Sequence, residues 1–313
     1  MNDYVIVWDI ETIPDLKGFA AANFLLDKSD TEIREVMGDK FPKHIYHSIV
    51  CIGALIARRE SEYWAIEALG APHVGDRTEK ELIQAFVNKI AELKPQLVTF
   101  NGNSFDLPVL RYRAMSHSIS APGLAARPYF NRYTEDSIDL CDVLSSFAPQ
   151  AKVSLHGLCR MMGLPGKPEH IDGGEVERYY LQGKIREIAD YCETDIVNTY
   201  RLWLRHELFR GRLTPTQLQL SEKNLTSFHR GARRCQAASQ SNGFLTEASV
   251  PFALDQDEDR LAILGRFVSC VYRKPKSEHS GDEARRGSRV IRSSQSAEQS
   301  ERLGHPYPVT GAS

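Results

Sequence analysis

Residues 4–12 read Tyr-Val-Ile-Val-Trp-Asp-Ile-Glu-Thr. The first five are all β-branched or aromatic, a pattern typical of a β-strand that is buried on both faces. Asp9 and Glu11 follow at the end of this strand and, being two residues apart, are expected to point to the same side. Burying two carboxylates side by side is costly unless a cation lies between them. The alternative is that the strand simply emerges into solvent here, and one Asp-x-Glu does not decide between the two.

The composition is that of an ordinary globular protein. Of the 313 residues, 42% are hydrophobic and 26% are charged, which excludes a wholly disordered chain, a collagen-like chain and a coiled-coil rod. The longest strongly apolar run, residues 49–57, is far shorter than the ~20 residues that cross a bilayer, so we expect no membrane partner. The six cysteines form no C-x-x-C pair, and no secretory signal is visible at the N-terminus. We therefore expect reduced thiols and a cytoplasmic location.

The order of the expected elements indicates the fold class. Thr78 and Glu81 form a capping box in front of a helix with apolar residues at helical spacing. Strands are expected over 4–10, 48–57, 62–68, 96–101 and 137–140, and helices over 78–93, 105–115, 143–147, 155–162, 174–182, 185–208 and 214–228. Residues 15–46 are expected to be a long loop with a helical turn or two. Strands followed by a strand–helix alternation and then helices predict an α/β fold, a mixed β-sheet flanked by α-helices.

The character of the chain changes towards the C-terminus. Residues 276–302 contain few apolar side chains among Ser, Arg, Glu and Gly, too few to bury a core. We predict one domain over residues 1–230 and a divergent, largely disordered extension over residues 231–313. Residues 201–234 are rich in Lys and Arg, which suits either a solvated helix face or a surface that follows a phosphate backbone.

Two further acidic clusters lie in unusual surroundings. In the first, a strand ends at Asn101, and Phe105-Asp106 opens the next helix. An Asp in a first turn also suits the helix dipole. In the second, Tyr191 and Asp195 are four residues apart on a long helix and so share one face. A hydrogen-bonded Tyr–Asp pair would explain them equally well.

Together the three clusters form a recognisable set. Asp9-Ile10-Glu11-Thr12, Asn101-x3-Phe105-Asp106 and Tyr191-x3-Asp195 occur in the order of the three exonuclease motifs. The chain resembles DEDD-type 3′–5′ exonucleases of the ribonuclease-H-like superfamily. More closely, it is similar to predicted exonucleases related to the proofreading domain of family-B DNA polymerases. Residue 190 is Asp where the sister subclass has its His, so the resemblance is to the tyrosine (DEDDy) type.

The resemblance implies a catalytic set of four carboxylates and one tyrosine. These are Asp9, Glu11, Asp106, Tyr191 and Asp195. The carboxylates would bind two divalent ions, with Asp9 bridging both, Glu11 and Asp195 beside the water-activating ion, and Asp106 on the second ion through water. Because the motif ligands are carboxylates without His or Cys, Mg²⁺ or Mn²⁺ is expected.

The resemblance also implies the substrate and the residues that contact it. Tyr191 would orient the attacking water, and Asn101, Phe105 and Thr12 would contact the terminal nucleotide. The implied activity is removal of nucleoside 5′-monophosphates from single-stranded 3′ ends, with DNA favoured over RNA. An RNA-trimming exoribonuclease of the same chemistry and a non-catalytic nucleic-acid-binding module remain alternatives. A polymerase or repair partner is left open.

Overall fold

A computed structural model describes residues 2–166 and 173–241. One mixed sheet of five strands runs through it in the order β3-β2-β1-β4-β5. β2 is antiparallel to both β1 and β3, and β4 and β5 continue the sheet in parallel with β1. The strands are β1 (Tyr4–Pro14), β2 (His47–Arg59), β3 (Trp64–Gly70), β4 (Gln96–Thr99) and β5 (Ser137–Asp139). The predicted α/β fold with a mixed sheet is confirmed, and the arrangement is consistent with the ribonuclease-H-like class.

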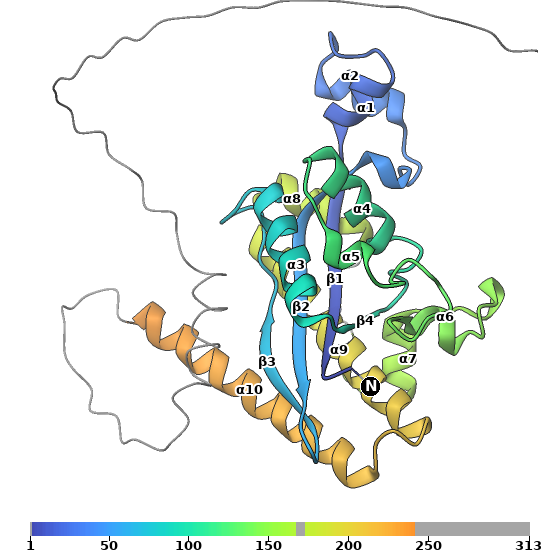
Figure 1. Cartoon of the computed structure of the whole chain (residues 1–313). Coiled ribbons are helices and arrows are strands. Elements are labelled where there is room, and N and C mark those ends of the chain that lie inside the picture. The colour runs from blue at the N-terminus through green and yellow to red at the C-terminus, as the bar shows by residue number, and fades with distance from the viewer. Residues whose placement is uncertain (1, 167–172, 242–313) are drawn as a thin grey trace, which may run out of the picture. The chain divides into compact units, whose positions relative to one another are not determined.

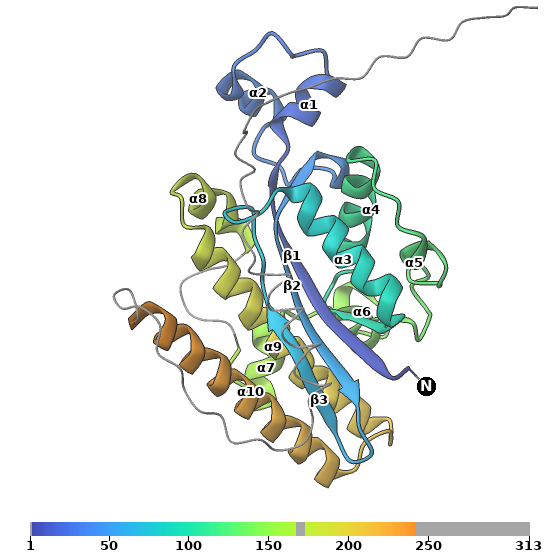
Figure 2. The same ribbon diagram turned by 60° about the vertical axis from the view of Figure 1, so that its left-hand side comes forward.

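Helices cover both faces of this sheet. α3, α4 and α5 lie on one side of the strands, and α8, α9 and α10 lie on the other (Figures 1 and 2). The α-helices are α1 (Leu16–Ala22), α2 (Asp30–Met37), α3 (Glu79–Leu93), α4 (Asp106–Ser116), α5 (Pro122–Ala125), α6 (Leu140–Leu144), α7 (Leu155–Met161), α8 (Val176–Leu181), α9 (Ile185–Phe209) and α10 (Pro215–Ser241). Short 3₁₀ turns lie at His44–Tyr46, Pro149–Ala151 and Gly173–Glu175. No helix within the described ranges has the length and apolar composition needed to cross a bilayer.

β1 is buried on both faces, as its sequence predicts. Val5 and Val7 belong to the core on the α9 side, whereas Ile6, Trp8 and Ile10 belong to the core on the side of α3 and α4. The alternating side chains of β1 therefore contribute to two hydrophobic cores, one on each face of the sheet. This placement fixes which helices the acidic residues at the end of β1 can meet.

Several element boundaries differ from the sequence-based expectation. Residues 15–46 contain two helices, and α2 begins with a complete capping box between Ser29 and Glu32. α6 begins directly after β5, earlier than expected, because the Asp139 carboxylate accepts hydrogen bonds from the first free amides of the helix. α10 runs to Ser241, beyond the expected end near residue 228, since residues 230–240 are mostly good helix formers. The predicted disordered extension falls mostly on residues 242–313, outside the described ones, so the division at 230/231 stays a prediction.

α10 protects the edge strand β3. The Trp64 amide donates to Ser221 Oγ at 3.0 Å, and the Ile66 amide donates to Asn224 Oδ1 at 2.8 Å. An uncovered edge strand would present these amides to other chains. Helix side chains therefore take the place of a sixth strand.

Replacement of Ser221 by Ala tests this edge protection. Ser221 is fully buried, so the Trp64 amide would lose its partner in a place that water does not reach. We expect Ser221→Ala to lower the free energy of unfolding by about 1–3 kcal/mol, measured by urea denaturation. Ser227→Ala, an exposed position on the same helix, is the matched control. Equal stabilities of the two variants would contradict this account.

Candidate active site

The acidic residues gather where the parallel strands end. Val7 of β1 is level with Val98 of β4, and Thr99 is level with Asp139 of β5. Asp9, Asn101 and Asp139 thus lie at the carboxyl edge of three parallel strands. In open α/β sheets this edge is where ligands bind.

Asp9 and Glu11 lie on the α9 face of β1, the face that Val5 and Val7 occupy further back. The backbone irregularity of β1 falls after Glu11, so the two-residue alternation holds through both acids. A carboxylate oxygen of Asp9 and one of Glu11 lie within 4.8 Å of one another. Both carboxylates therefore point to the same side of β1, as their two-residue spacing predicts.

One cavity of about 1060 Å³ opens at this edge. All eight residues that the motifs singled out line it. These are Asp9, Glu11, Thr12, Asn101, Phe105, Asp106, Tyr191 and Asp195. Three segments that are far apart in the sequence therefore meet at one place, while the individual role of each residue stays a prediction.

Asp106 is buried at the start of α4, beside β1. Its Oδ1 accepts a hydrogen bond from the amide of Ile10, the residue between Asp9 and Glu11, at 3.0 Å. The backbone of β1 therefore fixes the position of the Asp106 carboxyl group. Burial raises the pKa of Asp106 well above its usual range, and the negative charge of Asp139 raises it further, although the Ile10 amide opposes both. An anionic Asp106 therefore needs a compensating positive charge.

Tyr191 and Asp195 reach the cavity from α9. Both side chains are buried, and their four-residue spacing places them one turn apart on the same face. Burial raises the pKa of the Tyr191 phenol, and the charge of Asp195 raises it further. Glu11 and Asp9 act on it in the same direction. The tyrosine therefore keeps its proton at neutral pH.

Cys192 is a neighbour that the motif analysis missed. Its Sγ lies 3.8 Å from Asp9 Oδ2 and, with Asp9 and Glu11, forms a group of potential metal ligands. The expected ligand set consists of carboxylates alone, and Cys192 is not one of its positions although it lies between Tyr191 and Asp195 in the chain. The adjacent Cys51 thiol and burial raise the pKa of Cys192 well above its usual value, so the thiol is protonated and a poor ligand. Its spacing of three residues from Asp195 was the available signal.

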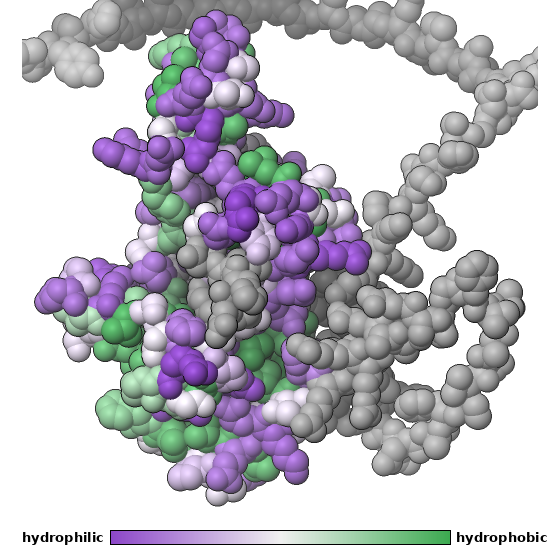
Figure 3. Space-filling model, turned by 180° about the vertical axis from the view of Figure 1, so that it is seen from behind, coloured by the Kyte–Doolittle hydropathy of each residue, from purple (hydrophilic) through white to green (hydrophobic). Residues whose placement is uncertain are grey.

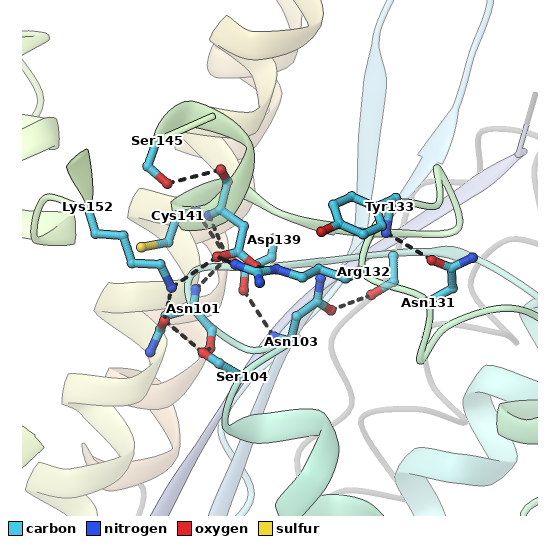
Figure 4. Close-up of polar contacts among 12 residues, drawn as sticks. Asn101, Asn103, Ser104, Asn131, Arg132, Tyr133, Asp139, Cys141, Ser145 and Lys152 are labelled. Atoms are coloured by element: carbon cyan, nitrogen blue, oxygen red, sulfur yellow. Dashed lines mark hydrogen bonds and ion pairs between the residues drawn. The ribbon is translucent and has the colours of Figure 1, made fainter. Parts of the chain in front are cut away.

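A second buried carboxylate, Asp139, holds the turn that carries Asn101. Asp139 accepts hydrogen bonds from the Asn101 amide at 2.7 Å and the Asn103 amide at 3.0 Å (Figure 4). Asn101 adopts a left-handed backbone conformation with φ of 73°, which Asn tolerates better than most residues. The sequence gives little sign of this role, since Asp139 is far from the motifs.

The Asn101 side chain is itself oriented by two donors. Ser104 Oγ donates to Asn101 Oδ1 at 2.9 Å, and Lys152 Nζ donates to the same oxygen at 3.1 Å. Lys152 is in turn held by an ion pair of 2.9 Å with Asp142, a carboxylate that Arg132 also contacts (Figure 4). With its oxygen engaged, Asn101 has its amide N–H groups left to offer to a ligand.

Thr12 and Phe105 complete the cavity wall. The Thr12 hydroxyl lies 2.9 Å from His47 Nδ1, and His47 Nε2 lies 3.2 Å from the Pro42 carbonyl. Because a carbonyl can only accept, Nε2 carries the proton and Thr12 donates to Nδ1. Burial lowers the pKa of His47, which suits this neutral form. The Phe105 ring lies 5.0 Å from the His47 ring.

Four of the basic residues in the range 201–234 are engaged in ion pairs. Arg201 and Arg205 pair with Glu222 of α10, and Arg210 and Arg212 pair with Glu135. None of these arginines lines the cavity. These four therefore join helix to helix and helix to loop, and the interpretation of the whole range as a phosphate-tracking surface stays a prediction.

Comparison with known proteins identifies the family. The family described as predicted 3′–5′ exonucleases related to the exonuclease domain of PolB matches residues 39–247, two thirds of the chain. The chain belongs to this family. The match includes the motifs at residues 101–106 and 191–195, whereas Asp9 and Glu11 precede it.

Among solved structures, the family-B DNA polymerase from the hyperthermophilic archaeon Pyrobaculum calidifontis is similar to this PolB-related chain. The sequence identity is 18% and the TM-score is 0.43. The similarity covers 66% of this chain but 25% of the polymerase, so the chain spans about a quarter of that protein's length. No curated protein matches.

The residues present fit divalent metal ions, which exonuclease domains of this type use. The four motif carboxylates line one cavity, and three of them, Glu11, Asp106 and Asp195, are buried. Hard divalent ions prefer such oxygen ligands. The raised pKa of Asp106 marks a place where an added positive charge would stabilise the carboxylates.

Gly53 sets the distance between α9 and the sheet. It pairs with Asp9 across β1 and β2, and a Cβ built on it would lie 2.2 Å from Ile196 Cδ1 and 2.7 Å from Cys192 Sγ. Ile196 and Cys192 are both fully buried in the core, so neither has free space to move into. The helix that carries Tyr191 and Asp195 can approach β1 only because this position has no side chain.

Gly53→Ala should therefore displace α9 and disturb both stability and the site. We expect overpacking to cost about 1–3 kcal/mol in the free energy of unfolding, measured by denaturation. Gly70→Ala on β3, where a Cβ meets nothing within 4 Å, is the control. Adding Ile196→Val to Gly53→Ala removes the nearest clashing methyl and should recover part of the loss. A Gly53→Ala protein as stable as Gly70→Ala would disprove the close-packing argument.

Proposed function

We propose that the chain hydrolyses phosphodiester bonds at single-stranded 3′ ends, DNA in preference to RNA, and releases nucleoside 5′-monophosphates. The observation that supports this proposal is the meeting of four carboxylates and a tyrosine in one cavity. The order of these residues along the chain is that of the DEDDy motifs. Membership of the PolB-related exonuclease family supplies the reaction class.

In this proposal Asp9, Glu11, Asp106 and Asp195 hold two Mg²⁺ or Mn²⁺ ions, with Asp9 shared between them. Such ions lower the pKa of bound water and stabilise the charge that develops on the phosphate in the transition state. The Ile10 amide fixes the Asp106 carboxyl, and α9 fixes Asp195, so the ligands are held in place before substrate arrives.

Tyr191 positions the attacking water in this proposal. Because burial and the neighbouring acids raise its pKa, the phenol retains its proton at Oη and acts as a hydrogen-bond donor rather than a base. Its separation of one helical turn from Asp195 places the donor beside a proposed metal ligand.

Asn101, Phe105 and Thr12 are proposed to contact the terminal nucleotide. Asn101 offers its amide N–H groups because Lys152 and Ser104 occupy its oxygen. Thr12 donates its proton to His47, which leaves oxygen lone pairs that can accept from a sugar hydroxyl. Phe105 presents a half-buried ring at the cavity wall.

A cleavage assay with 5′-labelled strands tests the activity and ranks the substrates. Single-stranded DNA and the RNA of matching sequence are incubated with the full chain in Mg²⁺, in Mn²⁺ and in chelator. We expect a ladder that shortens from the 3′ end with either metal and no cleavage in chelator. Faster loss of RNA than of DNA would favour the exoribonuclease alternative. Strand binding without cleavage in both metals would leave the non-catalytic module.

Removal of one carboxylate tests the assignment of the site. Asp195→Ala takes away a proposed metal ligand, so we expect kcat/KM to fall by about 1000-fold or more while the fold is retained. Asp190→Ala is the matched control, because Asp190 is an exposed acid on the same helix and does not line the cavity. Comparable rates for the two variants would remove Asp195 from the catalytic set.

A further inference from the structure

The cavity has a second wall that none of the exonuclease motifs supplies. The segment between β1 and β2 projects beyond the end of the sheet, where α1 and α2 lie at the top of the view (Figure 1). Phe41 and Lys40 of this segment line the same cavity as Asp9 and Asp106. In the space-filling view from behind, hydrophobic residues lie among hydrophilic ones on this projection (Figure 3). This projection is thus one side of the entrance to the candidate active site.

Phe41 is an exposed aromatic ring held in a defined place. Its exposed fraction is 73%, yet its ring centroid lies 4.9 Å from that of His47 and 5.4 Å from that of Phe105. Phe105 directly precedes Asp106. The Phe41 ring therefore continues the aromatic wall outward from the proposed metal ligands, with most of its surface open to the solvent.

His47 anchors this ring to the catalytic strand. The imidazole bonds Thr12, the residue after Glu11, on one side and the carbonyl of Pro42, the residue after Phe41, on the other. Arg34 joins the segment to α8, because it donates to the Gly38 carbonyl at 2.7 Å and to Glu177 of α8 at 3.0 Å. The segment is thus fastened to both β1 and α8, so the position of Phe41 is coupled to the geometry of the site.

Charged residues of both signs adjoin the ring, because Asp39 and Lys40 both line the cavity beside Phe41. Lys40 precedes Phe41, is exposed, and lines the cavity. A cation next to an aromatic face is the combination with which proteins hold single strands, the cation contacting phosphate and the ring stacking on a base. Phe24 on the same projection is even more exposed, at 93%, but it does not line the cavity and no cavity-lining cation adjoins it in sequence.

We propose that Phe41, backed by His47 and Phe105, is a base-stacking subsite for an unpaired nucleotide at the 3′ end. The proposal rests on the proposed exonuclease function and adds the feature that selects single strands. A base can lie on Phe41 only when it is free of its partner strand, so a paired end must first open. Stacking does not depend on base identity, because every base has a π face.

The test measures whether the contribution of the bases to binding affinity depends on the Phe41 ring. A 5′-fluorescein-labelled oligothymidylate is compared with the same strand carrying abasic residues at its last three positions. Binding is followed by fluorescence anisotropy in chelator, so that the measurement does not require cleavage. The proteins are the full chain, Phe41→Ala, Phe41→Trp and the control Phe24→Ala.

We expect base removal to weaken binding by the full chain about tenfold. Phe41→Ala should lose about the same factor with the intact strand and nothing further with the abasic strand. Phe41→Trp should keep the base dependence, and Phe24→Ala should match the full chain. A base dependence that persists unchanged in Phe41→Ala, or that is lost equally in Phe24→Ala, would overturn the subsite.

The two proposals fail in different ways. If the protein shortens strands but its binding does not depend on the bases, the subsite is disproved and the exonuclease proposal stands. If binding depends on the bases through Phe41 but the protein never cleaves a strand, the subsite stands and the exonuclease proposal is disproved. No measurable binding of either strand, in a protein that cleaves, would likewise overturn the subsite.

Discussion

The close approach of α9 to the sheet at Gly53 is the constraint on which the site depends. Gly53 sits beside Asp9 in the ladder, and Cys192 and Ile196 of α9 occupy the space that a side chain at 53 would fill. The helix therefore brings Tyr191 and Asp195 to the same cavity as Asp9 and Glu11. If α9 lay further from the strand, each residue would be unchanged in the sequence, but the carboxylates would no longer share one cavity.

A second constraint acts from the other side of β1. The Ile10 amide donates to the Asp106 carboxyl at 3.0 Å. The side chains of β1 thus supply two carboxylates on one face, and its backbone positions the Asp106 carboxylate of α4. Because Asp139 holds the turn between β4 and α4 by two amides, the position of Asp106 is fixed at both ends of the connecting loop. The four carboxylates thus come from strand β1, the first turn of α4 and the body of α9 rather than from loops, an arrangement that favours accurate geometry.

The sequence predicted those parts of the structure that local patterns determine. The two-sided burial of β1, the Thr78 capping box and the shared face of Tyr191 and Asp195 all depend on residues close together in the chain. The order of the three motifs then predicted which segments meet.

Contacts between segments that are far apart in the chain could not be predicted from the sequence. Asp139 belongs to none of the motifs, and Cys192 occupies an unspecified position within the third. Their importance comes only from what the fold places beside them. The basic residues from Arg201 to Arg212 resembled a binding surface, because their partners Glu222 and Glu135 are brought to them only by the tertiary structure. The Ser29–Glu32 capping box is a local signal for a helix start, and it lies within residues 15–46, where a long loop was predicted.

The electrostatics of the cavity link metal binding to substrate binding. Burial and the charge of Asp139 raise the pKa of Asp106, and burial together with the charges of Asp195, Glu11 and Asp9 raises the pKa of Tyr191. The acidic floor of the cavity therefore repels a polyanion. Positive charge is available at the rim, where Lys40 lines the cavity beside Phe41. A strand can therefore be attracted at the rim through its phosphates and held by stacking, but its terminal phosphate can reach the floor only when cations neutralise the carboxylates. In the proposed reaction, entry of the last phosphodiester onto the floor would therefore depend on the metal ions, whereas stacking of a base at the rim would not.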